Sequence, residues 1–498
     1  MSFMGLDIGT TGCKAVAFDR QGHELAFAYR EYQLLSPQEG WAELDSAHVC
    51  DCCFEVIGEV ARQCRSDPVR AMGISSQGEA ITPVDANGTI LSNAMVSSDA
   101  RAAGIAKCWP ERFGPQRLYQ ITGHTAHPMF TLFKLLWVRE HQPEVWSAAT
   151  AFHCFEDLLH LRLGLKPAIS WPLAGRTMLF DVLEHRWDPT ILAAARLDPA
   201  RLARPVASGS VVGTIPRGVS DRLALSGDVA VVAGGHDQTC CALGVGATVP
   251  GKAMYATGTV ECICPALGQP TFSPELQAGN LCTYDFTVPG LYTTVAFSLT
   301  GGNILKWFRD QFGQPEVRRA KEQGQDPYTL LIRSMSDRPT GLLVLPYFAP
   351  TGTPYFDTNT KGAVLGLRLT TSRQEFLRAL LEGVALEMRL NVDILQRNGV
   401  EISEFVATGG GARSPEWTQL KADVLGKPLA TATVAESGCF GAAMLAQSAV
   451  TGVSVQELTK ANVSTGDLIE PDAQRAAYYA ERFSVYKHIY PSLRGLGI

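Results

Sequence analysis

Apolar residues recur along this chain with the spacing of helices in some segments and of strands in others. Residues 129–141 are apolar at positions 129, 132, 133, 136 and 137, and residues 376–388 repeat that three- and four-residue spacing. The spacing predicts two amphipathic helices. Short apolar runs at 229–233, 342–345 and 405–408 predict strands. Because the two kinds of element alternate, we expect an α/β architecture.

The N-terminal residues predict a β-hairpin. Phe3–Ile8 and Lys14–Phe18 flank the tight turn Gly9-Thr10-Thr11-Gly12. A helix is expected from Asp45–Ser46, either of which can cap it, toward Gln63.

A second glycine–threonine turn, Ala256-Thr257-Gly258-Thr259, lies near the middle of the chain and resembles the first. This repetition predicts two related halves, each with a phosphate-binding turn. Gly and Pro interrupt the pattern around 247–252, so we expect domains at 1–247 and 248–498. Ligands commonly bind between domains, and we expect an inter-domain cleft here.

Composition narrows the possible classes of protein. The chain has 498 residues, of which 46% are hydrophobic and 18% charged, values typical of a soluble globular enzyme. Its net charge is −6, and it lacks the basic cluster that nucleic-acid binding needs. No apolar stretch approaches the roughly 18 residues of a membrane span, and the N-terminus lacks a signal-peptide pattern. We therefore expect a cytoplasmic protein.

The chain has 13 cysteines, which are scattered. His48, Cys50, Cys52 and Cys53 lie close together, but C-x-C-C within a helix cannot direct three thiols at one ion, and no second ligand pair accompanies it. We expect buried free thiols, with no zinc and no disulfides.

The segment Asp7–Lys14 has the groups of a phosphate site. Its glycines let backbone N–H groups approach an anion, Thr10 and Thr11 add hydroxyls, and Lys14 adds a positive charge. Asp7 could hold magnesium through water. The alternative is an ordinary hairpin turn, since the segment is not a P-loop.

Asp237 follows the predicted strand 229–233 in the segment Gly234-Gly235-His236-Asp237-Gln238. A carboxylate at the start of a helix is stabilised by the helix dipole. It could accept the proton of a hydroxyl that attacks phosphorus, or it could simply cap the helix. His236 is interpreted as a packed or hydrogen-bonded neighbour.

A third segment joins the predicted strand 405–408 to a well-specified helix. Ser414 is a good N-cap, Pro415 suits the first helical position, and Gly426 is a stop signal. The glycines at 409–411 would let a flat base or sugar lie against the backbone. The alternative is a flexible connector.

These segments resemble the FGGY family of carbohydrate kinases over essentially the whole chain. The family's first signature is matched by Met129-x-Thr131-x-x-Lys134-Leu135-x-Trp137-Val138-x-Glu140-His141. Its second is matched by Gly362-x-Val364-x-Gly366-Leu367, Glu375-Phe376 and Ala379-Leu380-Leu381-Glu382. The resemblance implies an α/β, two-domain fold of the sugar kinase–heat-shock ATPase–actin (ribonuclease H-like) type with an inter-domain cleft.

The resemblance also implies residue roles. Asp237 would be the catalytic base, acting with ATP and Mg²⁺, and Asp7 would lie at the metal. The nucleotide would contact Asp7, Thr10, Thr11, Lys14, Gly258, Thr259, Gly302, Asn303, Gly409, Gly410, Gly411 and Ala412.

The sugar-binding segments depart from the family pattern. Gly78 stands where glycerol kinases have arginine, and Gln77–Glu79 does not reproduce the Met-His of xylulose kinases. Ser97 replaces the tryptophan of Trp-x-Asp-x-Arg, which would remove one wall of the sugar pocket. The polar groups expected to read substrate hydroxyls are Gln77, Gly78, Glu79, Asp99, Arg101 and Gln238.

The leading hypothesis is ATP- and Mg²⁺-dependent phosphorylation of a primary hydroxyl on a five- or six-carbon ketose or polyol, with xylulose first. The partner would be a small sugar or polyol, and a homodimer is possible. One alternative is a non-catalytic sugar or nucleotide sensor on the same scaffold. Another is a chaperone- or actin-like ATPase, which the two kinase signatures disfavour. Sugar-dependent ADP release distinguishes the kinase from both.

Overall fold

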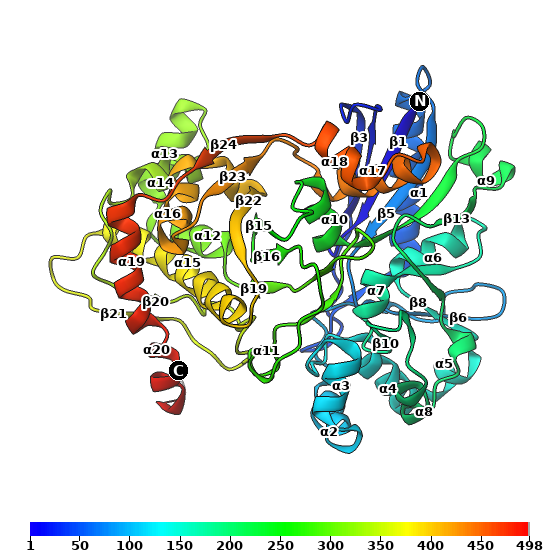
Figure 1. The fold of residues 1–498 in the computed structure, drawn as a ribbon, viewed down its shortest axis with the longest axis horizontal. Helices are drawn as coiled ribbons and strands as arrows, with labels where there is room; N and C mark the ends of the chain where they lie inside the picture. Colours follow the sequence, from blue (N-terminus) through cyan, green and yellow to red (C-terminus); the bar gives the residue numbers. More distant parts are fainter. Residues whose placement is uncertain (497–498) are drawn as a thin grey trace.

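The computed structural model describes residues 1–496, which form two lobes, each built around a six-stranded mixed sheet (Figure 1). The first sheet has the order β13-β14-β5-β1-β2-β3. Its strands are β1 (Ser2–Ile8), β2 (Gly12–Phe18), β3 (Glu24–Glu31), β5 (Val69–Ser76), β13 (Val211–Thr214) and β14 (Ala230–His236).

The second sheet repeats the topology of the first. Its order is β19-β16-β15-β22-β23-β24, with strands β15 (Gly251–Thr257), β16 (Glu261–Pro265), β19 (Ala296–Ser298), β22 (Ile402–Thr408), β23 (Leu429–Ala432) and β24 (Thr465–Ile469). In both sheets a three-stranded antiparallel meander (β1-β2-β3, β15-β16-β19) continues through two parallel pairings to an antiparallel edge strand. The two related halves expected from the repeated turns are therefore present in the fold.

Helices connect the strands in both halves, and some pack on the sheet faces while others pack on one another. Those of the first half are α1 (Ser46–Gln63), α2 (Ala103–Phe113), α3 (Pro115–Thr122), α4 (Thr131–His141), α5 (Pro143–Ala148), α6 (Phe155–Arg162), α7 (Trp171–Gly175), α8 (Pro189–Ala195), α9 (Arg217–Arg222) and α10 (Asp237–Gly244). Those of the second are α11 (Pro274–Ala278), α12 (Gly302–Phe312), α13 (Gln314–Gln323), α14 (Pro327–Ser334), α15 (Arg373–Arg397), α16 (Pro415–Leu425), α17 (Ser437–Thr451), α18 (Val455–Asn462), α19 (Ala473–Tyr486) and α20 (Ile489–Leu493).

Six small two-stranded pairs lie outside the main sheets. They are β4 (Glu43–Leu44) with β7 (Ala94–Met95), β6 (Thr82–Val84) with β8 (Ala151–His153), β9 (Ala168–Ser170) with β12 (Arg204–Val206), β10 (Phe180–Asp181) with β11 (Arg186–Trp187), β17 (Tyr284–Asp285) with β18 (Tyr292–Thr293), and β20 (Leu343–Leu345) with β21 (Ala363–Leu365).

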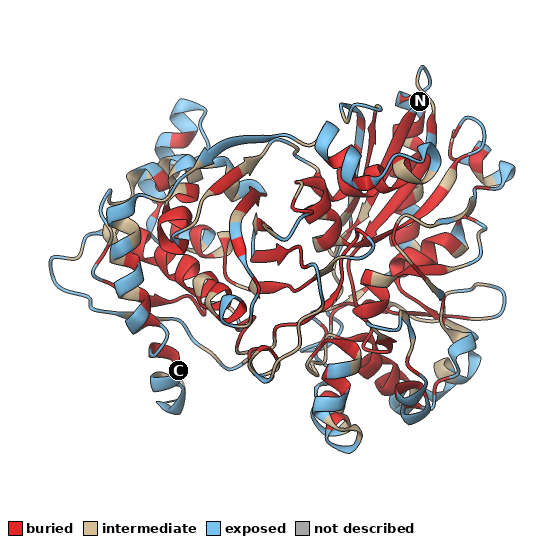
Figure 2. Ribbon diagram, viewed as in Figure 1, coloured by how far each residue is buried: buried red, intermediate tan, exposed pale blue. Residues whose placement is uncertain are grey.

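Helix α17 belongs to the second half of the sequence but packs on the first sheet, against β1, β5 and α10. In Figure 1 it lies beside β1, away from the other orange and red elements apart from α18. The contact is backbone to backbone: a Cβ at Gly5 would lie 1.7 Å from the carbonyl oxygen of Cys439, and one at Gly73 2.1 Å from that of Ala442. Only glycine permits this approach. Figure 2 shows the central strands and α17 largely buried.

A second segment also crosses from one half to the other. The backbone N–H of Thr283 donates to the carbonyl of Gly123 at 2.9 Å, and β17 contacts α7. The division at 247/248 remains a prediction. These two segments show that parts of the second half of the sequence pack on the first half.

Most of the element predictions are confirmed. The β1–β2 hairpin forms as expected, Asp45 caps α1, and α16 runs from Pro415 to Leu425 between its Ser414 cap and a left-handed Gly426. The predicted helix 129–141 starts at Thr131, after an extended Phe130. The predicted helix 376–388 is longer in the structure, Arg373–Arg397, and a capping box of Ser372 and Glu375 sets its start.

All 13 cysteines are free thiols, and Cys50, Cys52 and Cys53 are buried in α1. Within residues 1–496, no group of three or more His, Cys, Asp or Glu side chains is arranged to hold a metal ion. None of the helices in that range is both long and apolar enough to span a bilayer.

Candidate active site

The first glycine–threonine turn is braced by the end of β5. The Gln77 amide donates to the carbonyl of Gly9 at 2.8 Å and accepts from the Thr10 hydroxyl at 3.2 Å. The Gly9 N–H closes the turn on the carbonyl of Gly12 at 3.0 Å. Thr11, at the tip, is exposed. Gln77, expected to contact substrate, therefore uses its side chain to hold the turn.

Asp7 and Lys14 face each other across the β1–β2 ladder. Lys14 Nζ lies 3.6 Å from Asp7 Oδ2 and 2.6 Å from Glu436 Oε2, just before α17. Asp7 Oδ1 accepts a 2.7 Å hydrogen bond from the Ser75 hydroxyl. Burial acts to lower the pKa of Lys14, but Asp7, Cys439 and Glu436 outweigh it and the pKa is raised. Lys14 therefore stays charged.

The start of α17 lies where the two halves meet. A Cβ at Gly438 would be 3.5 Å from the Asp7 carboxyl carbon. The neighbouring Ser437 hydroxyl is 2.9 Å from Cys241 Sγ and 3.5 Å from the Thr408 hydroxyl at the end of β22. The first turn, α10 and the end of β22 thus share one junction.

Asp237 is the first residue of α10, and its side chain is 31% exposed. Its Oδ1 accepts from the Gln238 N–H at 2.7 Å and lies 3.1 Å from His236 Nε2, which leaves Oδ2 as the freer oxygen. Burial, then the charges of Asp7 and Glu79, raise the pKa of Asp237 to about 7. A carboxylate with that pKa suits acid–base chemistry near neutral pH.

A cluster of buried polar side chains surrounds this carboxylate. His236 Nδ1 lies 2.9 Å from the Tyr284 hydroxyl. The Arg176 guanidinium pairs with the Glu79 carboxylate, and Arg176 Nη1 lies 3.2 Å from His124 Nε2.

The environment of Gly78 explains why no side chain stands there. A Cβ at this position would lie 3.1 Å from His236 Cδ2 and 3.3 Å from the Arg176 Cβ. His236 and Arg176 therefore occupy the space that a longer residue at position 78 would need. Glu79 follows with φ +65°, an uncommon conformation for a residue with a Cβ. This conformation accompanies the pairing of its carboxylate with Arg176.

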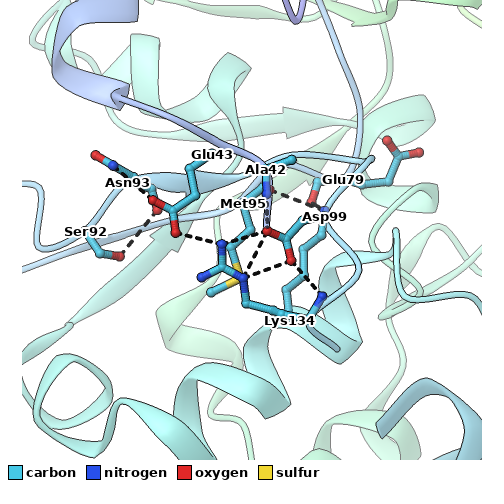
Figure 3. Close-up of polar contacts among 9 residues, drawn as sticks. Ala42, Glu43, Glu79, Ser92, Asn93, Met95, Asp99 and Lys134 are labelled. Atoms are coloured by element: carbon cyan, nitrogen blue, oxygen red, sulfur yellow. Dashed lines mark hydrogen bonds and ion pairs between the residues drawn. The ribbon is translucent and has the colours of Figure 1, made fainter. Parts of the chain in front are cut away.

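Asp99 and Arg101 form a second buried network (Figure 3), in which Lys134 Nζ donates to the Glu79 carbonyl at 3.0 Å. Asp99 Oδ2 accepts from the Ala42 N–H at 2.7 Å, and Arg101 Nη2 donates to Asp99 and to Glu43 Oε1 at 2.7 Å. The Arg101 side chain is 2% exposed and its guanidinium lies 3.6 Å from the centre of the Trp41 ring. The carboxylate of Glu79 points away from this network. Asp99 and Arg101 thus bind each other and the β4–β7 region.

A cavity of about 720 Å³ opens beside the second glycine–threonine turn, within the size range of small-molecule sites. Its lining comes from that turn and the starts of α12, α14 and α16, and includes Thr257, Gly258, Thr259, Gly302, Asn303, Tyr328, Gly410, Gly411, Ser414 and Trp417.

The turn and α12 are directly bonded. The Gly302 N–H donates to the carbonyl of Gly258 at 2.8 Å, and the Asn303 amide caps its own helix through Leu299 and Gly301. A Cβ at Gly410 would meet nothing within 4 Å, so this backbone is open to a ligand. Gly409 and Ala412 lie in the same loop without lining the cavity.

A buried ion pair supports the second turn from below. Lys421 Nζ of α16 lies 2.6 Å from Glu261 Oε1 on β16 and donates to the Thr257 hydroxyl at the end of β15. The side chains of Lys421 and Glu261 are 2% and 0% exposed. Tyr255 donates to the other oxygen of Glu261. The pair therefore joins both strands of the hairpin to the helix that borders the cavity.

The sequence interpretation missed Arg176, His124, Tyr284, Glu436 and Lys421. For Lys421 a signal existed: it lies on the stripe of the predicted helix 415–425 that also carries Trp417 and Val424, and a lysine at such a position usually has a buried partner. The others are brought to the site by contacts between residues far apart in sequence, which leave no local pattern.

Comparison with known proteins identifies similar chains. The models for the N- and C-terminal domains of the FGGY family of carbohydrate kinases match residues 2–244 and 253–450. A xylulose kinase of Lactococcus lactis is 28% identical over 495 residues, covering 98% of this chain and 96% of its own. A gluconokinase of Bacillus licheniformis is 26% identical over 446 residues, covering 89% and 86%. The crystal structure of xylulose kinase from Rhodospirillum rubrum matches with a TM-score of 0.90 at 26% identity, over 100% of both chains.

Proposed function

The chain belongs to the FGGY family of carbohydrate kinases, and from that premise we propose that it phosphorylates a primary hydroxyl of a five- or six-carbon ketose or polyol, with a xylulose-like ketose as the first candidate. As a sugar kinase of this family it uses ATP and a small carbohydrate as substrates.

The observation that carries the proposal is the environment of Asp237. One oxygen is held by the Gln238 N–H and His236, and the other is left freer to accept a proton. With its pKa raised to about 7, this group is about half ionised at neutral pH, ionised above it, and still basic enough to take the proton of an attacking hydroxyl. We assign it as the general base.

We assign the nucleotide to the cavity beside the second turn. The base and ribose would lie against the open backbone of Gly410, and the phosphates would extend along Gly258–Thr259 toward Thr10, Thr11 and Lys14. Gly411 lines the same cavity but packs closely on Thr257 and Trp417. Gly302, Asn303, Gly409 and Ala412 would shape this site through their backbones.

The donor set fits Mg²⁺. This ion is usually held by one or two carboxylates together with phosphate oxygens and water. The charge of Asp7 contributes to the raised pKa of Asp237, and a divalent cation near Asp7 would offset that repulsion. When bound it would neutralise charge on the phosphates.

The substrate pocket favours a neutral polyhydroxy compound over a sugar acid. The negative charges of Asp7 and Glu79 both raise the pKa of Asp237, and Arg176 is already paired with Glu79. A substrate carboxylate would add repulsion, and Arg176 would not be free to meet it. Glu79 and Gln238 are the substrate-binding residues in this proposal, and the missing side chain at Gly78 leaves room for His236 and Arg176 beside them. Gln77, Asp99 and Arg101 would support the site indirectly.

The test is coupled ADP release measured over pentuloses, hexuloses, pentitols, erythritol, glycerol and gluconate. We expect release with a neutral ketose or polyol and little with gluconate. Asp237→Asn should bind nucleotide normally while losing about 10²- to 10⁴-fold in kcat. ADP release without sugar would indicate a simple ATPase. Sugar binding without release would indicate the sensor, which the family membership and the base at 237 do not favour.

The cytoplasmic location and a homodimer remain predictions. On the edge strand β3, Leu25, Phe27 and Tyr29 are exposed. Size measurement in solution would test the dimer.

A further inference from the structure

We propose that His236 and Tyr284 are positioning residues for the base: Tyr284 fixes the tautomer of His236, and His236 fixes Asp237 so that Oδ2 faces the substrate hydroxyl. This inference rests on the proposed kinase function and adds two residues to it.

The three side chains lie in one line of close polar contacts. The Tyr284 hydroxyl is 2.9 Å from His236 Nδ1, and His236 Nε2 is 3.1 Å from Asp237 Oδ1. Tyr284 is 0% exposed and His236 6%, so water does not compete strongly for either contact. The Gln238 N–H holds the same oxygen at 2.7 Å.

The chemistry of the partners assigns the proton positions. Ionised Asp237 can only accept, so His236 Nε2 must carry the hydrogen in that contact. A neutral imidazole has one N–H, and burial lowers the pKa of His236 so that the ring is neutral. Nδ1 is then an acceptor, and the Tyr284 hydroxyl must donate to it. Without that hydroxyl the ring can take the other tautomer, which offers Asp237 a lone pair.

Charged and titratable groups face this line from several elements. Arg176 and His124 lower the pKa of His236, after burial. Asp7 and Glu79 raise the pKa of Asp237, again after burial. The thiols of Cys240, Cys241, Cys262 and Cys264 also lie near Asp237, with pKa values raised by burial. Burial, Asp7 and Glu79 thus oppose ionisation of Asp237, whereas His236 is a neutral group that can donate a hydrogen bond to it.

Tyr284 comes from β17, part of the segment of the second half that packs on the first. Its ring packs near both His124 and His236, at centroid distances of 5.5 and 5.9 Å. The orientation of a base on α10 therefore depends on a residue about fifty positions later in the sequence.

The test compares full-length variants by the pH profile of kcat and by KM for each substrate. Tyr284→Phe keeps the ring and removes the hydroxyl, and His236→Leu removes the donor to Asp237. We expect kcat to fall about fivefold in the first and about 10- to 100-fold in the second. Loss of a donor to a carboxylate raises its pKa, so the acid limb should move up by about one to two pH units in His236→Leu. KM for ATP should stay within about twofold.

Tyr119→Phe is the matched control. Tyr119 is also buried, and its hydroxyl donates to the carbonyl of Leu281, near β17, at 3.1 Å. It should leave kcat and the pH profile unchanged. His236→Gln, which keeps an N–H donor, should recover part of the loss and serves if His236→Leu does not fold.

The proposal is overturned if Tyr284→Phe and both His236 variants match Tyr119→Phe while Asp237→Asn is inactive. Near-normal turnover in Asp237→Asn would instead overturn the base assignment and with it the proposed function.

Discussion

The buried Lys421–Glu261 pair gives the sharpest test of what supports the cavity that we assign to the nucleotide. We consider Lys421→Met, which keeps the length of the side chain and removes its charge. The change leaves Glu261 with the Tyr255 hydroxyl but without the cation 2.6 Å from its other oxygen. It also removes the donor to the Thr257 hydroxyl at the end of β15.

The expected magnitude follows from burial. Both side chains are nearly inaccessible to water, and removing one partner of such a pair costs about 3–5 kcal/mol because the other charge is left uncompensated. The double variant Lys421→Met/Glu261→Gln has no buried charge at this point. It should recover most of the lost free energy, since replacing a whole buried pair is often nearly neutral.

The assays are urea denaturation and steady-state kinetics. The single variant should unfold at lower urea than the wild type, with the double variant in between. Because the pair holds Thr257 and α16 beside the cavity, KM for ATP should rise in the single variant while KM for the sugar changes little. The reasoning is refuted if the single variant is as stable as the wild type, or if the double variant is no more stable than the single one.

Two further predictions concern the substrate side. Because the pKa of Asp237 is raised to about 7, its carboxylate form is lost below neutral pH. We therefore expect kcat/KM for the sugar to fall about tenfold per pH unit below about pH 7. A profile that stays flat down to pH 5.5 would contradict this. Gly78→Met places a side chain where His236 and Arg176 leave little room. It should raise KM for the sugar at least about tenfold and leave KM for ATP unchanged. Equal effects on both KM values would argue against a local clash.

Local features of the sequence were sufficient for elements whose ends carry their own signals. The helix after the triple glycine was predicted from Ser414, Pro415 and Gly426, and it forms between them. The two glycine–threonine hairpins were predicted in the same way, and the sheets around them repeat one another. In each case a few neighbouring residues determine the geometry.

The surroundings of the candidate base were not predictable in this way. Arg176 and Tyr284 reach the Asp237 cluster through contacts between distant residues. Asp99 and Arg101 have polar side chains that suggested a pocket, but each is the other's partner in a buried network. Which polar group faces a substrate and which faces another side chain depends on packing, and one sequence does not record it.

Because α17 packs on the first sheet, the chain cannot be cut near residue 247 into two independently stable fragments. A fragment ending near residue 247 would leave the backbone at Gly5 and Gly73 uncovered, together with the apolar strands around it. Such a fragment would need the missing helix to become a stable unit. Two separately expressed fragments should therefore associate or aggregate rather than remain independent, and a synthetic peptide spanning 437–451 is the piece that the N-terminal fragment lacks at that face.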